Sequence, residues 1–155
     1  MKKTLLSITA SLFSLLSIAQ MSNYVFSASS GTFTDITGGT NISSIQVDDG
    51  TSSILAIGFT FNYRGVDYTK FKANSNGWIT FDTLATPAGF DQRANNLSGN
   101  TSHRPILAPL WDDISGVNGT ASYITTGTSP NRVLTVEGKN YKWNWLATPA
   151  SISFQ

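Results

Sequence analysis

The chain contains no cysteine and only one histidine among its 155 residues. Without cysteine there is no disulfide bond and no side chain to carry a lipid, so a lipoprotein is excluded. Structural zinc sites are built mainly from Cys and His, and one histidine cannot supply such a set. A hydrophobic core must therefore hold the fold together, and a chain of this length is long enough to form one.

The first 19 residues have the features of a cleavable export signal. Two lysines precede an apolar stretch over residues 5–18 that is interrupted only by small Ala, Ser and Thr side chains. This stretch is shorter than the roughly 20 apolar residues that span a bilayer. The small residues Ser17 and Ala19 predict cleavage before Gln20, and an uncleaved membrane anchor is the alternative. We expect a secreted or cell-surface protein with no membrane span after cleavage.

Charged residues are scarce, at 12% of the chain against about 25% in ordinary globular proteins. Cleavage removes Lys2 and Lys3, which leaves 8 basic and 9 acidic residues and a net charge of −1. The sequence has no run of basic residues that could follow a phosphate backbone. Nucleic acid is therefore not an expected partner.

The mature region, residues 20–155, is predicted to form one all-β domain, an antiparallel β-sandwich of jelly-roll or immunoglobulin-like type. Helical periodicity is absent from it, whereas apolar side chains often recur at every second position. The clearest case is a run of large side chains that would share one face of a strand. These are Ile57, Phe59, Phe61 and Tyr63.

Turn residues separate the predicted strands. Residues 62–67 are expected to turn around Arg64 and Gly65 and to return into a second strand, which forms a hairpin. Asn76 followed by Gly77 predicts a tight turn of type I′, because both central residues of that turn need a positive φ.

The second half of the chain also has strand-like patterns. Residues 104–114 are apolar but contain two prolines, which predicts an edge or bulged strand. Residues 121–125 and 132–136 are expected to pair as a hairpin, with the second strand extending toward Trp145. A final strand pattern runs to Gln155 with no turn to close it, so we expect further strands beyond the given sequence.

Five segments of the chain are familiar when they are taken together. They are Tyr24-Val-Phe-Ser-Ala-Ser-Ser-Gly-Thr-Phe-Thr, Ile57-Gly-Phe-Thr-Phe-Asn-Tyr, Ala73-Asn-Ser-Asn-Gly-Trp-Ile-Thr-Phe, Arg104-Pro-Ile-Leu-Ala-Pro-Leu-Trp-Asp-Asp-Ile and Ser151-Ile-Ser-Phe-Gln. In this order they resemble the N-terminal β-domain of secreted and surface proteins of the Bacteroidetes, which commonly end in a type IX secretion sorting domain. They are more distantly similar to the nidogen-type extracellular domain of adhesion proteins. This resemblance implies an extracellular, non-catalytic module, and it implies an aromatic residue where Gly138 stands.

Two acidic pairs are the first candidates for site chemistry. Asp48 and Asp49 precede a glycine and are expected to form a turn. Asp112 and Asp113 follow a tryptophan, and we expect them to cap the next loop or, alternatively, to offer oxygen ligands to Ca²⁺. His103 lies in a loop-like region without the context of a catalytic nucleophile. No enzymatic activity and no cofactor other than calcium is predicted.

Aromatic residues offer a second candidate site. Tyr141, Trp143 and Trp145 stand at alternate positions, so on one strand they would share a face. Such a face either packs into the core or presents a platform for a sugar ring or a protein partner. The leading hypothesis is a module for adhesion or ligand binding that contacts an extracellular protein or glycan. The alternative is an ancillary carbohydrate-binding domain of a secreted hydrolase.

Overall fold

The computed structural model describes residues 27–83, 93, 104–149 and 152–155. The predicted signal peptide and His103 lie outside the described residues. The chain divides into two units, Met1–Phe33 and Thr34–Gln155. All the described strands belong to the second unit, and the described residues of the first, 27–33, form neither helix nor strand.

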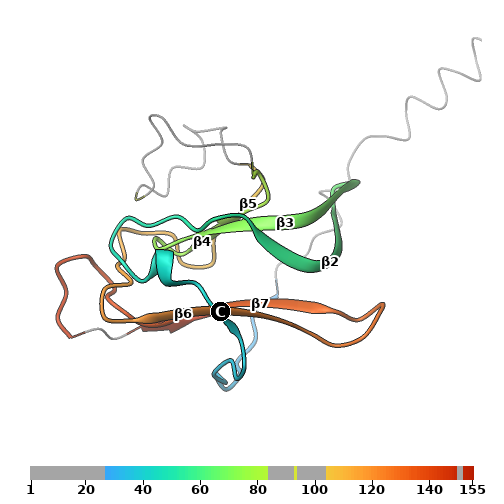
Figure 1. The fold of residues 1–155 in the computed structure, drawn as a ribbon. Helices are drawn as coiled ribbons and strands as arrows, with labels where there is room; N and C mark the ends of the chain where they lie inside the picture. The colour runs from blue at the N-terminus through green and yellow to red at the C-terminus, as the bar shows by residue number, and fades with distance from the viewer. Residues whose placement is uncertain (1–26, 84–92, 94–103, 150–151) are drawn as a thin grey trace, which may run out of the picture. The chain divides into compact units, whose positions relative to one another are not determined.

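Two antiparallel four-stranded sheets face each other in the second unit, which confirms the predicted all-β sandwich (Figure 1). One sheet has the order β1-β6-β7-β8 and the other has the order β2-β3-β4-β5. A single 3₁₀ turn, η3 (Ser43–Ile45), follows the first strand. The strands are β1 (Thr40–Asn41), β2 (Leu55–Tyr63), β3 (Val66–Asn74), β4 (Trp78–Thr80), β5 (Ile106–Leu107), β6 (Thr120–Thr126), β7 (Val133–Tyr141) and β8 (Ile152–Phe154).

Neighbouring strands mostly follow one another in the sequence. The run β2 to β5 forms one sheet and β6 to β8 belongs to the other, so among the described strands only β1 departs from pairing with its neighbours in the sequence. Jelly-roll and immunoglobulin-like sandwiches instead use Greek-key connections that carry the chain between sheets more often. The sandwich class was therefore predictable from alternation, whereas the local connections are a finding of the structure.

The β2–β3 hairpin has the predicted turn. Arg64 and Gly65 have φ values of 54° and 80°, which is the pair of positive values that a type I′ turn needs. Along β2 the large side chains from Ile57 to Tyr63 point inward and alternate with exposed residues, as the period-two pattern predicted.

The β3–β4 turn is tight, as predicted, but it is not of type I′. Asn74 pairs directly with Trp78, so the loop has three residues. Only Gly77 has a positive φ, at 78°, and Asn76 does not. This matches a three-residue hairpin loop, in which one left-handed residue, commonly glycine, closes the turn.

The segment from 104 to 114 gives a much shorter strand than predicted. Only β5 is extended, and it lies at the edge of its sheet beside β4. The chain then turns at Pro109 and Leu110, which brings Trp111 into the interior next to Trp78. Proline cannot donate a ladder hydrogen bond, which explains why pairing stops at this point.

Gly138 pairs with both neighbouring strands, although the resemblance implies an aromatic residue there, and the β7–β8 register shifts between Gly138 and Tyr141. It pairs with Ala121 on β6 and with Phe154 on β8. A Cβ atom at this position would lie 2.6 Å from the Cζ atom of Phe154. The aromatic ring is thus supplied from the neighbouring strand, and glycine leaves the space that the ring fills.

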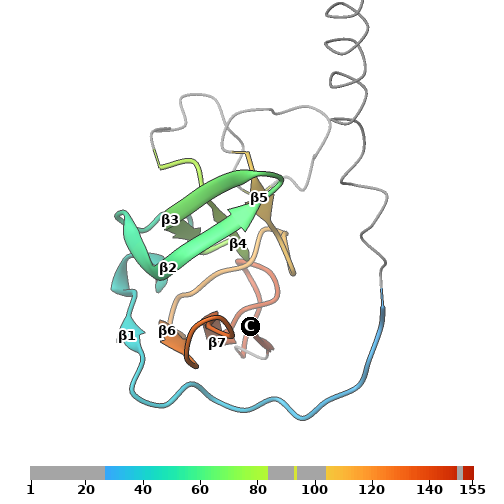
Figure 2. The ribbon, with the colours of Figure 1, turned by 90° about the vertical axis from the view of Figure 1, so that its right-hand side faces the viewer.

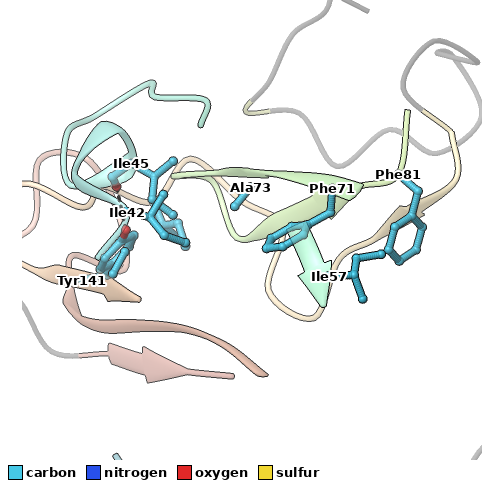
Figure 3. Packing of buried hydrophobic residues seen from close by; sticks show 9 residues of the cluster. Ile42, Ile45, Ile57, Phe71, Ala73, Phe81 and Tyr141 are labelled. Carbon is cyan, nitrogen blue, oxygen red and sulfur yellow. Dashed lines mark hydrogen bonds between the residues drawn. The ribbon is translucent and has the colours of Figure 1, made fainter. Parts of the chain in front are cut away.

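The two sheets lie one over the other (Figure 2), and the core between them continues to the η3 turn (Figure 3). The Tyr141 side chain is fully buried, and its hydroxyl donates to the carbonyl oxygen of Ile45 at 2.6 Å. A smaller cluster joins Trp78 and Trp111, with ring centroids 6.1 Å apart. The main cluster consists of Ile42, Ile45, Ile57, Phe71, Ala73, Phe81, Ile114, Ala121 and Tyr141.

Candidate functional site

Four loops meet at one end of the sandwich, which we call the loop end: residues 46–51, 75–77, 110–116 and 142–146. The Ser75 N–H donates to the carbonyl of Gly50 at 2.8 Å, and the Gly116 N–H donates to the carbonyl of Val47 at 2.9 Å. Ser115 and Lys142 exchange two backbone hydrogen bonds. Backbone hydrogen bonds therefore join segments that are far apart in the sequence.

The β3–β4 turn also packs directly against the third of these loops. A Cβ atom built on Gly77 would lie 2.1 Å from the carbonyl oxygen of Leu110. Any other residue here would both meet this oxygen and be strained by the positive φ. The glycine therefore fixes how closely the turn carrying Asn76 approaches the loop carrying Asp112 and Asp113.

The first acidic pair forms the predicted turn and ties it to the β3–β4 loop. The Asp48 carbonyl accepts from the Gly50 N–H at 3.1 Å and from the Ser75 hydroxyl. The Asp49 carboxylate accepts a hydrogen bond from the side-chain amide of Asn76 at 2.9 Å. These hydrogen bonds therefore hold two loops together.

The two carboxylates of the second acidic pair lie in different environments. Asp112 is exposed, and its carboxylate accepts from the backbone N–H of Asp113 at 2.8 Å, which is the geometry of a local cap. Burial raises the pKa of the Asp113 carboxyl above its ordinary value, and the negative charge of Asp49 raises it further. Asp48 and Asp112 act in the same direction, while the positive charge of Arg93 lowers it. Both acidic pairs thus contribute to one region of negative potential.

Metal binding at Asp112 and Asp113 stays a prediction. Within the described part of the chain, no three side chains of the types His, Cys, Asp and Glu are grouped as a metal site would need. An oxygen-rich site would have to include amide or backbone oxygens. One buried amide oxygen, on Asn76, lies in this region, and sequence reasoning had read that residue only as part of a turn.

The predicted aromatic platform is wrong in its geometry. Strand β7 ends at Tyr141, which is fully buried, so it does not share a surface with the two tryptophans. Burial raises the pKa of its hydroxyl far above the ordinary value. Trp143 and Trp145 lie beyond the strand in the fourth loop, with 61% and 47% of their surface exposed.

A turn explains why the alternating pattern is not a strand. The Asn144 side chain accepts from the Leu146 N–H at 3.0 Å, and its carbonyl accepts from the Ala147 N–H at 2.8 Å. An Asn side chain that bonds to the backbone two residues on makes a turn. The Trp145 N–H donates to the carbonyl of Asp113 at 3.0 Å. The two predicted sites are therefore neighbours, although their sequence positions gave no sign of it.

An apolar cavity of about 490 Å³ lies between the sheets, and Gly77 of the β3–β4 turn is among the residues that line it. Apolar side chains of β4, β5, β7 and β8 line most of it. Glu137 borders this cavity, and its buried carboxylate accepts from the Ile36 N–H at 3.0 Å and from the Gln155 side chain at 2.9 Å. Sequence reasoning missed this carboxylate, because nothing in its neighbours in the chain indicates a partner 101 residues away.

The model of the family described as NIDO related matches residues 23–155. The chain therefore belongs to the NIDO-related family, which supports the nidogen-type part of the resemblance. Alpha-tectorin of Mus musculus and alpha-tectorin of Homo sapiens are each 32% identical to it over 85 residues. Those residues are 52% of this chain and 4% of each relative, so the chain spans a small fraction of their length. No solved structure matches the chain.

The family match confirms the predicted extracellular or cell-surface location. In the described residues, no helix is long and apolar enough to cross a membrane. Both relatives are animal proteins, so they lend no support to the Bacteroidetes and type IX part of the resemblance. That part stays a prediction, as does cleavage before Gln20.

Proposed function

We propose that this chain is a non-catalytic extracellular module that binds an extracellular protein through its Trp143–Trp145 loop. The observation that carries the proposal is the exposure of two tryptophans and of Leu146 on one short loop. Large apolar side chains that are exposed together are typical of contact surfaces. Tryptophan is also among the residues that contribute most to binding energy in protein interfaces.

The loop is anchored, which favours binding over accidental exposure. The Ser115–Lys142 backbone pair fixes its start, the Trp145–Asp113 hydrogen bond fixes its middle, and Asn144 closes its turn. A loop held in this way loses little conformational entropy when a partner binds. The membership in an extracellular family agrees with a partner outside the cell.

Carbohydrate binding is the second candidate, and the same side chains favour it. Planar aromatic rings stack against the apolar faces of sugars, and both indoles have exposed surface. In this case the module would serve a secreted hydrolase whose catalytic part lies in another domain. A protein partner ranks first because the exposed aliphatic Leu146 adds apolar contact area but no ring for stacking.

Binding assays with one double variant separate the candidates. Trp143→Ala/Trp145→Ala is compared with wild type and with Val133→Ala, a control that truncates another exposed apolar side chain. The probes are a panel of purified extracellular matrix proteins and a glycan array. We expect the double variant to lose about tenfold or more in affinity for a matrix protein and the control to keep it. Glycan binding with the same dependence would favour the second candidate, and binding unaffected by the double variant would refute both.

The sequence of the gene beyond Gln155 tests the wider setting. Repeats and a secretion sorting domain would agree with a bacterial surface protein of the predicted kind. A glycosidase or peptidase domain would instead favour the ancillary role. The gene sequence does not depend on the Trp143–Trp145 loop, so it and the binding assay test different parts of the proposal.

A further inference from the structure

Asn76 has an unusual environment for a turn residue. It is fully buried, its backbone N–H donates to the Asn74 side chain at 2.8 Å, and its amide nitrogen donates to Asp49. In the described part of the protein, its side-chain oxygen has no hydrogen-bond donor. Buried acceptors are almost always paired, so an unpaired one calls for a partner of another kind.

A second buried oxygen in the same region also lacks a donor. It is Oδ1 of Asp48, again with respect to the described residues. The two oxygens belong to adjoining loops, because Ser75 bonds to Asp48 and Asn76 bonds to Asp49. Two enclosed acceptors without donors are satisfied either by a water molecule, which donates twice, or by a cation.

The surrounding charge favours a cation over a water molecule. The loop that carries Asp112 and Asp113 lies against the Asn76 turn, because Gly77 leaves no room between the turn and the carbonyl of Leu110. The carboxylates of Asp48, Asp49, Asp112 and Asp113 are therefore carried by adjoining loops, and those of Asp48, Asp49 and Asp112 repel that of Asp113. The positive charge of Arg93 opposes this repulsion only in part, because one positive group faces four negative ones. A water molecule would pair the two oxygens but would not offset the repulsion between carboxylates.

The geometry points to a Ca²⁺ site at the loop end, with ligands from the carboxylates of Asp48 and Asp113 and from the amide oxygen of Asn76. Asp49 holds the Asn76 amide in place and adds negative charge. Ca²⁺ takes six to eight oxygen ligands and accepts carbonyls and waters among them, so three acidic side chains are not needed. Extracellular modules that bind Ca²⁺ typically do so with Kd values of roughly 10⁻⁴ to 10⁻³ M.

Thermal unfolding of the full secreted chain tests the site. The melting temperature is measured in EGTA, in about 10 mM CaCl₂, and in MgCl₂ and NaCl solutions of matched ionic strength. We expect Ca²⁺ to raise the melting temperature by about 5 °C or more, from mass action at roughly 10 to 100 times the Kd. Equal effects of Mg²⁺ or NaCl would mean charge screening alone and would overturn the proposal, as would no effect of Ca²⁺.

Variants locate the effect. Asp113→Asn should abolish the Ca²⁺-dependent rise, while Asp67→Asn, which changes an exposed carboxylate near the start of β3 and away from the Asn76 turn, should keep it. A rise that Asp113→Asn leaves intact would overturn the assignment. Tb³⁺ luminescence is a second readout on the wild type, since Trp111 precedes Asp112 and the Trp145 N–H bonds to Asp113. We expect tryptophan-sensitised Tb³⁺ emission that decreases when Ca²⁺ displaces the bound Tb³⁺. The absence of this emission from the wild type would refute the site, whether or not the variants fold.

Discussion

The buried hydroxyl of Tyr141, at the end of β7, donates to the carbonyl oxygen of Ile45 in the η3 turn, over 2.6 Å and 96 residues of sequence (Figure 3). This bond joins the turn after β1 to the sheet that contains β7. Because the hydroxyl is enclosed, its charged form is strongly disfavoured, which raises its pKa. Burial of this hydroxyl in the core therefore makes the stability of the fold depend on pH in the alkaline range.

Replacement of this tyrosine by phenylalanine keeps the ring but removes the donor. Tyr141→Phe should lower the free energy of unfolding by about 1–3 kcal/mol, because the Ile45 carbonyl is left buried without a partner. Chemical denaturation at pH 7 measures the change. Tyr63→Phe, at a half-buried position on β2, is the control and should change stability by less. Equal effects of both variants would contradict the role assigned to this bond.

The same hydroxyl predicts how stability changes at high pH. In the unfolded chain it ionises near pH 10, whereas in the folded chain it stays protonated. The unfolded state therefore releases a proton that the folded state keeps, and stability should fall by up to about 1.4 kcal/mol per pH unit above pH 10. Tyr141→Phe should show a shallower decline in the same range. If the stability of wild type and of Tyr141→Phe fell equally steeply with pH, other groups would be responsible for the loss of stability at alkaline pH.

The Phe154 ring fills the space over Gly138, and this contact between β7 and β8 leads to a prediction. Gly138→Ala places a methyl group 2.6 Å from the Phe154 ring, and such overpacking typically costs about 1–3 kcal/mol. The double variant Gly138→Ala/Phe154→Leu should recover part of the loss, since leucine is smaller than the ring. Gly31→Ala is the control, because no atom lies within 4 Å of its added methyl group. Thermal unfolding compares the four proteins, and the absence of any recovery would mean that the ring is not what the methyl group meets.

Features of the fold that depend on nearby residues in the chain were predictable from the sequence. The Arg64–Gly65 turn, the inward face of β2 and the β6–β7 hairpin were read correctly, because turn residues and alternation act over a few positions. Alternation misled at Trp143 and Trp145, because strand β7 ends at Tyr141 and the Asn144 side chain closes a turn at these positions.

Relations between distant segments were not predictable in this way. Gly138 gave no sign that Phe154 fills the space above it, because that contact depends on how β7 and β8 pair. The approach of the Asn76 turn to Asp113 likewise depends on Gly77 packing against a loop more than 30 residues away in the sequence. The composition of the candidate site was therefore visible in part, whereas its assembly was not.

The four tryptophans should differ sharply in their contribution to stability. Trp111 is buried against Trp78, so Trp111→Ala should cost about 3–5 kcal/mol in the free energy of unfolding. Trp143 is largely exposed, and Trp143→Ala should stay within about 0.5 kcal/mol of wild type. Denaturant titrations of both variants provide the measurement. A large loss in Trp143→Ala would mean that this side chain stabilises the fold, which would weaken its proposed role as a binding residue.

Asp113→Asn should have opposite effects in the presence and absence of Ca²⁺. Burial and the charge of Asp49 raise the pKa of Asp113 above its ordinary value of 3.8, so the ionised carboxylate is less favourable in the folded state. The resulting loss of stability begins as pH rises past that value and is fully present at neutral pH. In EGTA at pH 7 the variant should therefore unfold at a higher temperature than wild type, and this advantage should vanish toward pH 3. In Ca²⁺ the order should reverse, because the wild type gains a ligand that asparagine replaces poorly. A variant less stable than wild type in EGTA would show that the carboxylate makes favourable contacts that outweigh the repulsion, so no cation would be needed at the loop end to offset it.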